Sequence, residues 1–197
     1  MMTPTHVFLN WALLGQRKET AEERWAIIAG ALFPDIGVWV FTAWFFSQYG
    51  FTFDDAIWDP LYDSTLVNAV FCMLHSFIVW PLLLIVGLYF RNRIIAFFAG
   101  SALLHSFVDF LVHAQDAYAH FIPLSWWRFH SPISYWDPSH FGNIIAPIDS
   151  AIGFCALIYI YPRVTSWWGR AVCLLFAALF LFHTAQRIFF PFGGDIS

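Results

Sequence analysis

Five long apolar segments dominate this 197-residue chain and limit what it can fold into. Each approaches the length of about 20 residues that a helix needs to cross the hydrocarbon core of a bilayer. They cover approximately residues 25–46, 66–90, 93–113, 144–161 and 168–190. We therefore predict an all-α polytopic membrane bundle with about five transmembrane helices, forming a single integral membrane domain over residues 1–197.

The composition agrees with this class of protein. Sixty per cent of the residues are hydrophobic, 21% are aromatic and only 11% are charged, which is far from the usual soluble mixture. The net charge of −4 gives no indication of a nucleic-acid partner. The three cysteines lie in apolar runs and are too few for a disulfide framework. The first residues lack a basic stretch and a cleavage site, so we expect no removable signal peptide.

A short apolar piece, residues 4–15, precedes the first predicted span. It is too short to cross a bilayer. Pro4 suits the start of a helix, and Thr3 or Thr5 could cap it. We predict a short N-terminal helix that is either re-entrant or interfacial.

The basic residues predict the orientation of the spans. Seven of the nine lie before the first span or in two short connections: Arg17, Lys18, Arg24, Arg91, Arg93, Arg163 and Arg170. The connections 47–65 and 114–143 carry only Arg128 between them. The positive-inside rule therefore predicts a cytoplasmic N-terminus and an outside C-terminus.

A polar stripe runs through the third predicted span. Ser101, His105, Asp109 and His113 recur every four residues, so they share one side of a helix. Ionisable groups are rare and costly inside a membrane, and they usually mark a functional site. The alternative is a structural hydrogen-bonded pair of His105 and Asp109 that holds two helices together.

Other ionisable groups fall at the same depth as this stripe. At about 1.5 Å per helical residue, seven groups lie roughly 16–24 Å from the basic flanks. They are His6, Asp35, His75, His105, Asp109, Asp149 and His183. Pro34 predicts a kink beside Asp35. For Asp149 and His183 two interpretations stay open, namely partners that orient metal-bound imidazoles or a separate interhelical pair.

The connection 114–143 is rich in histidine and aromatic residues. It contains Asp116, His120, His130 and His140, together with three tryptophans. One interpretation is an aromatic belt at the outer membrane interface. The other is a lid over a site that faces outward.

Four short motifs then carry a resemblance to a known family. Thr5-His6, Pro34-Asp35-Ile36, His75-Ser76 and His105-x-x-x-Asp109 occur in the order seen in bacterial membrane-bound metal-dependent hydrolases. That order also resembles the ligand order of the zinc-dependent phospholipase C family, and the resemblance covers residues 3–120. It implies a protein of the bacterial inner (cytoplasmic) membrane with a divalent metal. The implied ligands are His6, Asp35, His75, His105 and Asp109, a mixed set that suits zinc and also admits iron or manganese.

The chain also departs from the family pattern. The family has His-Arg-Gly-x-Thr-His-Ser around the middle motif, where this chain has Val70, Phe71 and Leu74. The family's Pro-Asp-Ile-Asp ends here in Gly37. A phosphate-binding arginine, a histidine and a carboxylate are therefore missing. His113, Asp116 and His120 are candidates to replace the missing ligands.

The leading functional hypothesis is a metal-dependent hydrolase that acts on an ester or phosphoester near the outer membrane face. Asp109, Asp116 and His120 are its candidate catalytic residues. The expected partners are the lipid bilayer and a lipid-like substrate. A second hypothesis is a non-catalytic subunit of a larger membrane complex, which fits the missing family residues. A third is a proton or ion pathway along the His and Asp layer.

Overall fold

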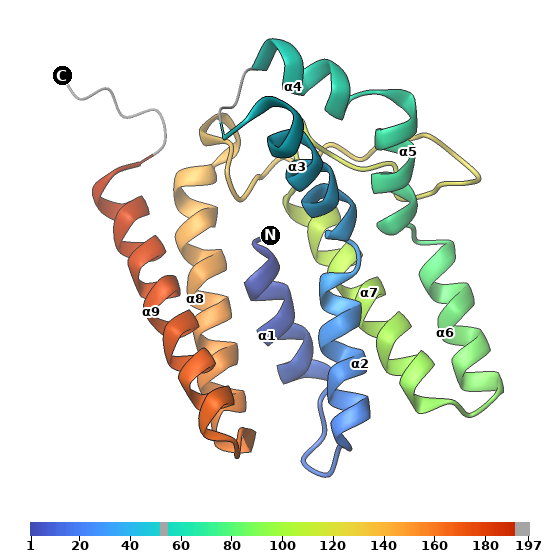
Figure 1. Cartoon of the computed structure of the whole chain (residues 1–197), viewed down its shortest axis with the longest axis vertical. Coiled ribbons are helices and arrows are strands. Elements are labelled where there is room, and N and C mark those ends of the chain that lie inside the picture. Colours follow the sequence, from blue (N-terminus) through green and yellow to red (C-terminus); the bar gives the residue numbers. More distant parts are fainter. Residues whose placement is uncertain (52–54, 192–197) are drawn as a thin grey trace.

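The computed structural model describes residues 1–51 and 55–191, and every regular element in these residues is a helix (Figure 1). The α-helices are α1 (Thr3–Leu14), α2 (Ala21–Leu32), α3 (Ile36–Tyr49), α4 (Asp55–Tyr62), α5 (Thr65–Leu74), α6 (Val79–Tyr89), α7 (Arg93–Val112), α8 (Gly142–Ile160) and α9 (Trp167–Phe189). Short 3-10 turns, Pro138–His140 and Tyr161–Arg163, precede and follow α8. The predicted all-α class is confirmed. Four helical segments are long and apolar enough to cross a membrane, or five if α2 and α3 form one bent span.

Two of the predicted spans are broken near their middle. The first divides into α2 and α3, whose axes differ by 61° across a break that contains Pro34, so the predicted kink is confirmed. The second divides into α5 and α6 at residues 75–78, where we expected an uninterrupted helix. Ser76 explains how this break is tolerated, because its hydroxyl accepts hydrogen bonds from the N–H groups of Ile78 and Val79 at the start of α6.

Helix α1 occupies the middle of the bundle. It packs against α2, α7 and α8, and its N-terminal end lies inside the molecule (Figure 1). Thr5, His6 and Asn10 on this helix are completely buried. Asn10 donates hydrogen bonds to the carbonyl and the hydroxyl of Ser101 on α7. The first turn of α1 is therefore inserted among the longer helices.

The basic connections gather at one end of the bundle, which we call the basic end. The α1–α2, α6–α7 and α8–α9 connections all lie there (Figure 1). Arg93 forms an ion pair with Glu23 and a hydrogen bond with Gln16, and Arg163 donates to the Gly15 carbonyl. The opposite end, the loop end, carries α4 and the segment 113–137. The orientation of these ends in a membrane stays a prediction, and residues 192–197, on which the C-terminal assignment depends, lie outside the described residues.

Close contact between α2 and α7 sets the position of the polar stripe. A Cβ atom on Gly30 would lie 2.2 Å from the carbonyl oxygen of Phe98, so only glycine allows this approach. Near that contact, the Ser101 hydroxyl donates to the Ile27 carbonyl at 2.7 Å. One turn further, His105 Nδ1 lies 2.7 Å from the Ala31 carbonyl. The stripe on α7 therefore faces α2 and the break that follows it.

Replacing Gly30 by alanine should push α2 away from α7 and lower the thermal unfolding temperature of the protein in detergent. Overpacking of this kind typically costs about 1–3 kcal/mol. Gly100→Ala on α7 is the matched control, because a Cβ there has its nearest neighbour at 3.9 Å. A Gly30→Ala protein as stable as the Gly100→Ala control would contradict this account of the α2–α7 contact.

The orientation can be tested with single cysteines at Ser139 and Ser166 in a chain without its native cysteines. Both serines are exposed and lie at opposite ends of the bundle. A membrane-impermeant thiol reagent added to intact cells should label Ser139→Cys only, because the basic end is predicted to be cytoplasmic. Labelling of Ser166→Cys alone would reverse the topology.

Candidate metal centre

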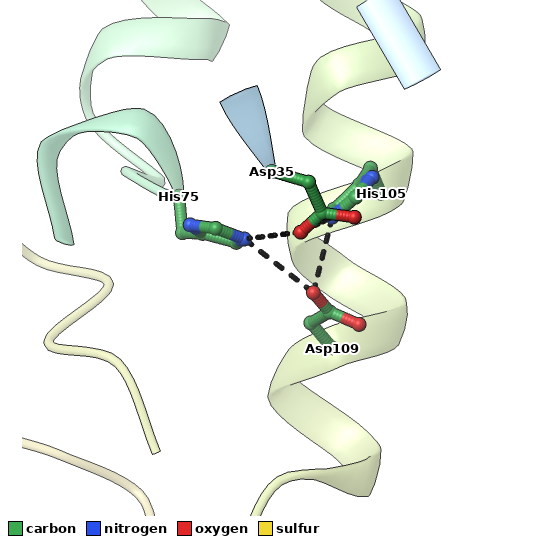
Figure 2. A group of neighbouring side chains, drawn as sticks. All are labelled: Asp35, His75, His105 and Asp109. Carbon is green, nitrogen blue, oxygen red and sulfur yellow. Dashed lines mark ion pairs between the residues drawn. The ribbon is translucent and has the colours of Figure 1, made fainter. Parts of the chain in front are cut away.

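Asp35, His75, His105 and Asp109 converge from three parts of the chain (Figure 2). Asp35 lies in the break between α2 and α3, and His75 directly follows α5. His105 and Asp109 lie one turn apart on α7. One nitrogen or oxygen atom from each residue lies within 4.8 Å of the corresponding atoms of the other three, so the group could hold a metal ion.

The distances between these atoms fit a single small cation. His75 Nε2 lies 3.7 Å from Asp35 Oδ1 and 3.4 Å from Asp109 Oδ2. His105 Nε2 lies 3.5 Å and 3.1 Å from the same two oxygens. Ligands at 2.0–2.2 Å from a tetrahedral ion would be separated by about 3.3–3.6 Å. The four observed separations lie close to this range.

The backbone determines which ring nitrogens face the centre. His75 Nδ1 lies 2.9 Å from the Phe71 carbonyl, and His105 Nδ1 contacts the Ala31 carbonyl. A carbonyl can only accept, so each Nδ1 carries hydrogen and each Nε2 of the neutral ring presents a lone pair. Both Nε2 atoms are buried and have no hydrogen-bond partner among the described residues. Lone pairs and carboxylate oxygens directed at one point match the donor set of a divalent metal.

Asp109 also uses its second oxygen. Oδ1 lies 2.9 Å from His6 Nε2, 3.5 Å from His113 Nε2 and 2.8 Å from the amino group of Met1. The His6 ring stacks on that of His105 with centroids 3.6 Å apart. His6, the fifth predicted ligand, therefore adjoins the group of four through Asp109 without being one of its members.

Asp116 and His113 form a pair next to the group of four. His113 Nδ1 lies 2.7 Å from Asp116 Oδ2, and Trp136 donates to the same oxygen. Burial raises the pKa of Asp116, but hydrogen bonds from His113 and Trp136 outweigh burial and bring the pKa below its usual value. Asp116 is therefore ionised near neutral pH and directs His113 toward Asp109.

His120, also a predicted catalytic residue, lies next to His75. The centroids of their rings are 6.3 Å apart, and His120 Nδ1 contacts the Tyr118 carbonyl. Burial, with a smaller contribution from the neighbouring His75, lowers the pKa of His120 to about 4, which keeps its imidazole neutral near pH 7. Its catalytic role stays a prediction.

A cavity of about 370 Å³ adjoins the group of four at Asp35 and Asp109, and we call it the polar cavity. Asp35, Asp109, His113 and Asp116 contribute its ionisable side chains. Three phenols complete the wall: Tyr62 from α4, and Tyr118 and Tyr135 from the segment 113–137. Tyr118 also stacks on the His75 ring at 3.9 Å between centroids. The cavity is large enough for the reacting part of a small ester beside the group of four.

The histidines of the segment 113–140 have different roles. His113 reaches the polar cavity. His130 Nδ1 contacts the Ala114 carbonyl, and His140 pairs with Asp137, so both fold the segment onto itself. Trp126 and Trp127 are each more than half exposed, whereas Tyr118 and Tyr135 line the polar cavity. The belt and lid interpretations both stay predictions.

Asp149 and His183 lie apart from the group of four. Asp149 accepts a hydrogen bond from the Met2 backbone N–H at 3.0 Å. His183 Nδ1 lies 2.8 Å from the Ser150 hydroxyl, which joins α9 to α8. His183 thus belongs to a separate interhelical contact, and Asp149 holds the start of α1 by its hydrogen bond with the Met2 backbone.

Comparisons of the chain with protein-family models, with curated proteins and with solved structures found no match. The resemblance to membrane-bound metal-dependent hydrolases therefore stays a prediction that rests on its four motifs. Four of the five implied ligands form one compact group, and the fifth touches that group.

We predict that purified protein binds a divalent metal and that His105→Ala abolishes this binding. Changes in residues that only orient ligands cost about 10–100-fold in affinity, so loss of a ligand should cost more than about 100-fold. Elemental analysis and titration with Zn²⁺ after chelation would measure the effect. His130→Ala is the matched control, because this exposed histidine lies outside the group of four. Equal metal content in both variants would exclude the site.

Proposed function

We propose that the protein is a metal-dependent hydrolase that cleaves an ester or phosphoester in the polar cavity. The observation that carries this proposal is the pair of buried, unpartnered Nε2 atoms facing two carboxylates at the wall of that cavity. A proton pathway needs no such arrangement of lone pairs around one point. A purely structural pair would involve His105 and Asp109 alone, whereas among the described residues His75 and Asp35 approach the same two side chains.

Asp35, His75, His105 and Asp109 are the proposed ligands. When bound, a divalent ion supplies Lewis-acid activation and lowers the pKa of a coordinated water toward neutrality. The burial of the ligands strengthens electrostatic effects there because nearby water is largely excluded. A mixed set of two histidines and two carboxylates suits zinc and also admits manganese or iron.

Asp116 and His113 are placed to handle protons. Both line the polar cavity, and their 2.7 Å contact connects the metal ligand Asp109 with the loop end. His113 Nε2 can take a proton released at the cavity, and Asp116 stabilises the imidazolium that results. This assigns Asp116 a positioning role and places His113 nearer to the reacting atoms.

Tyr62, Tyr118 and Tyr135 supply hydroxyl groups to the cavity wall. Phenols can donate hydrogen bonds to the oxygen atoms of an ester or phosphoester as charge develops on them. No Lys or Arg side chain is among the described residues that line the cavity. These phenols are therefore the candidates to replace the arginine that the sequence lacks relative to the family pattern.

Hydrolysis can be tested with p-nitrophenyl acetate and bis-p-nitrophenyl phosphate. Metal-loaded protein should release p-nitrophenol from one of them, and removal of the metal should abolish release. Asp116→Asn should retain metal and lose activity by about 100-fold, because His113 loses its supporting carboxylate and general acid–base catalysis contributes about 10²–10⁴-fold. His130→Ala should behave like the wild type, because this residue lies outside the cavity.

Two results would contradict the proposal. Metal-loaded wild type without activity on either ester class would exclude hydrolysis of these bonds. Metal-free protein that always purifies with the same larger partners would favour the alternative of a non-catalytic subunit.

A further inference from the structure

An apolar cleft runs along α1 between α2 and α9. Its volume is about 500 Å³. Its lining residues come mainly from α1, α2 and α9, with Trp39 from α3 and Val164 and Ser166 from the α8–α9 connection. The lining is largely aliphatic and aromatic, and includes Val7, Phe8, Ile28, Leu32, Val172 and Phe176.

The cleft adjoins the polar cavity. Thr3, Pro4 and Trp39 line both spaces. The Thr3 hydroxyl also donates a hydrogen bond to Asp35, one of the proposed ligands. One end of the cleft therefore meets the candidate metal centre, while the other reaches Arg24 and Trp168 near the basic end.

The dimensions of the cleft suit one hydrocarbon chain. It follows α1 from Thr3 to Trp11 and α9 from Phe176 to Trp168, which is eight residues, or about 12 Å, on each helix. An extended chain of about ten carbons has this length.

We propose that this cleft binds the hydrocarbon chain of a lipid substrate whose ester or phosphoester group lies in the polar cavity. The change from an apolar lining to carboxylates, imidazoles and phenols at Thr3, Pro4 and Trp39 matches the polarity change along such a molecule. The assignment of the ligand as substrate rests on the proposed function. The binding of a hydrocarbon chain does not, and it can be measured without turnover.

The direct test uses a decanoyl p-nitrophenyl ester with a diazirine in the middle of its chain, added to protein whose metal has been removed so that the ester is not cleaved. After illumination of the full-length protein in detergent, mass spectrometry should find the label mainly on residues that line the cleft in α1, α2 and α9. Lipid-facing residues of α6, such as Leu82 and Ile85, report nonspecific contact because they are exposed outside the cleft. Labelling spread evenly over α6 and the cleft would overturn the proposal.

A matched pair of variants on α9 sharpens the test. Val172 lines the cleft and is 49% exposed, whereas Leu179 lies outside it and is 48% exposed. Val172→Trp should fill the cleft and lower cleft labelling by about tenfold, equivalent to about 1.4 kcal/mol. Leu179→Trp should label as the wild type does. Equal labelling of the two variants would also overturn the proposal.

Parallel assays with p-nitrophenyl acetate separate the two proposals. Acetate hydrolysis with uniform labelling would retain the hydrolase and reject the lipid cleft. Cleft-specific labelling of a protein that, when loaded with metal, hydrolyses neither p-nitrophenyl acetate nor the long-chain ester would retain the lipid site and reject the hydrolase.

Discussion

The burial of the Asp109 carboxylate is the constraint on which the rest of this structure depends. The side chain is only 2% exposed on a helix long and apolar enough to cross a membrane. An isolated carboxylate in such surroundings would be very costly, so it must be compensated by nearby groups. His75 and His105 approach one oxygen, and His6 and His113 approach the other. The one carboxylate thus draws together α1, the end of α5, and the start of the segment 113–137.

This compensation requires interruptions in two helices. Pro34 ends α2 and leaves Asp35 at the bend, while the break after α5 leaves His75 at a helix end. Residues at such breaks can approach α7 more closely than residues in the middle of straight, parallel helices. Free backbone groups are the usual cost of a break within a membrane. Here the Ser76 hydroxyl and the Nδ1 atoms of His75 and His105 take up several of them.

The helical class, the kink at Pro34 and the grouping of four predicted ligands could be anticipated from the sequence. Apolar length predicted the helical class, and Pro34 predicted the kink. The grouping was predicted from the common depth of the ionisable residues together with the motif order of the family that the chain resembles. The break at residues 75–78 was not predicted, although Pro81 is a signal for it, because a proline disrupts the helical turn that precedes it. Depth also failed to separate His183 from the ligands, since helices at equal depth can face different neighbours. The convergence of the Tyr62, Tyr118 and Tyr135 phenols could not be predicted, because it depends on how a long irregular segment folds.

The arrangement of polar and apolar space gives the proposed site a direction. The polar cavity lies between the proposed ligands and the phenols of the loop end, while the cleft adjoins it at Thr3, Pro4 and Trp39 and runs along α1 toward the basic end. A water-soluble substrate would need only the first of these spaces. An amphiphile would use both, and its hydrocarbon chain would exchange one apolar environment for another at little cost in free energy. The chain would then contribute mainly by holding the ester against the ligands, so its binding would serve orientation more than affinity.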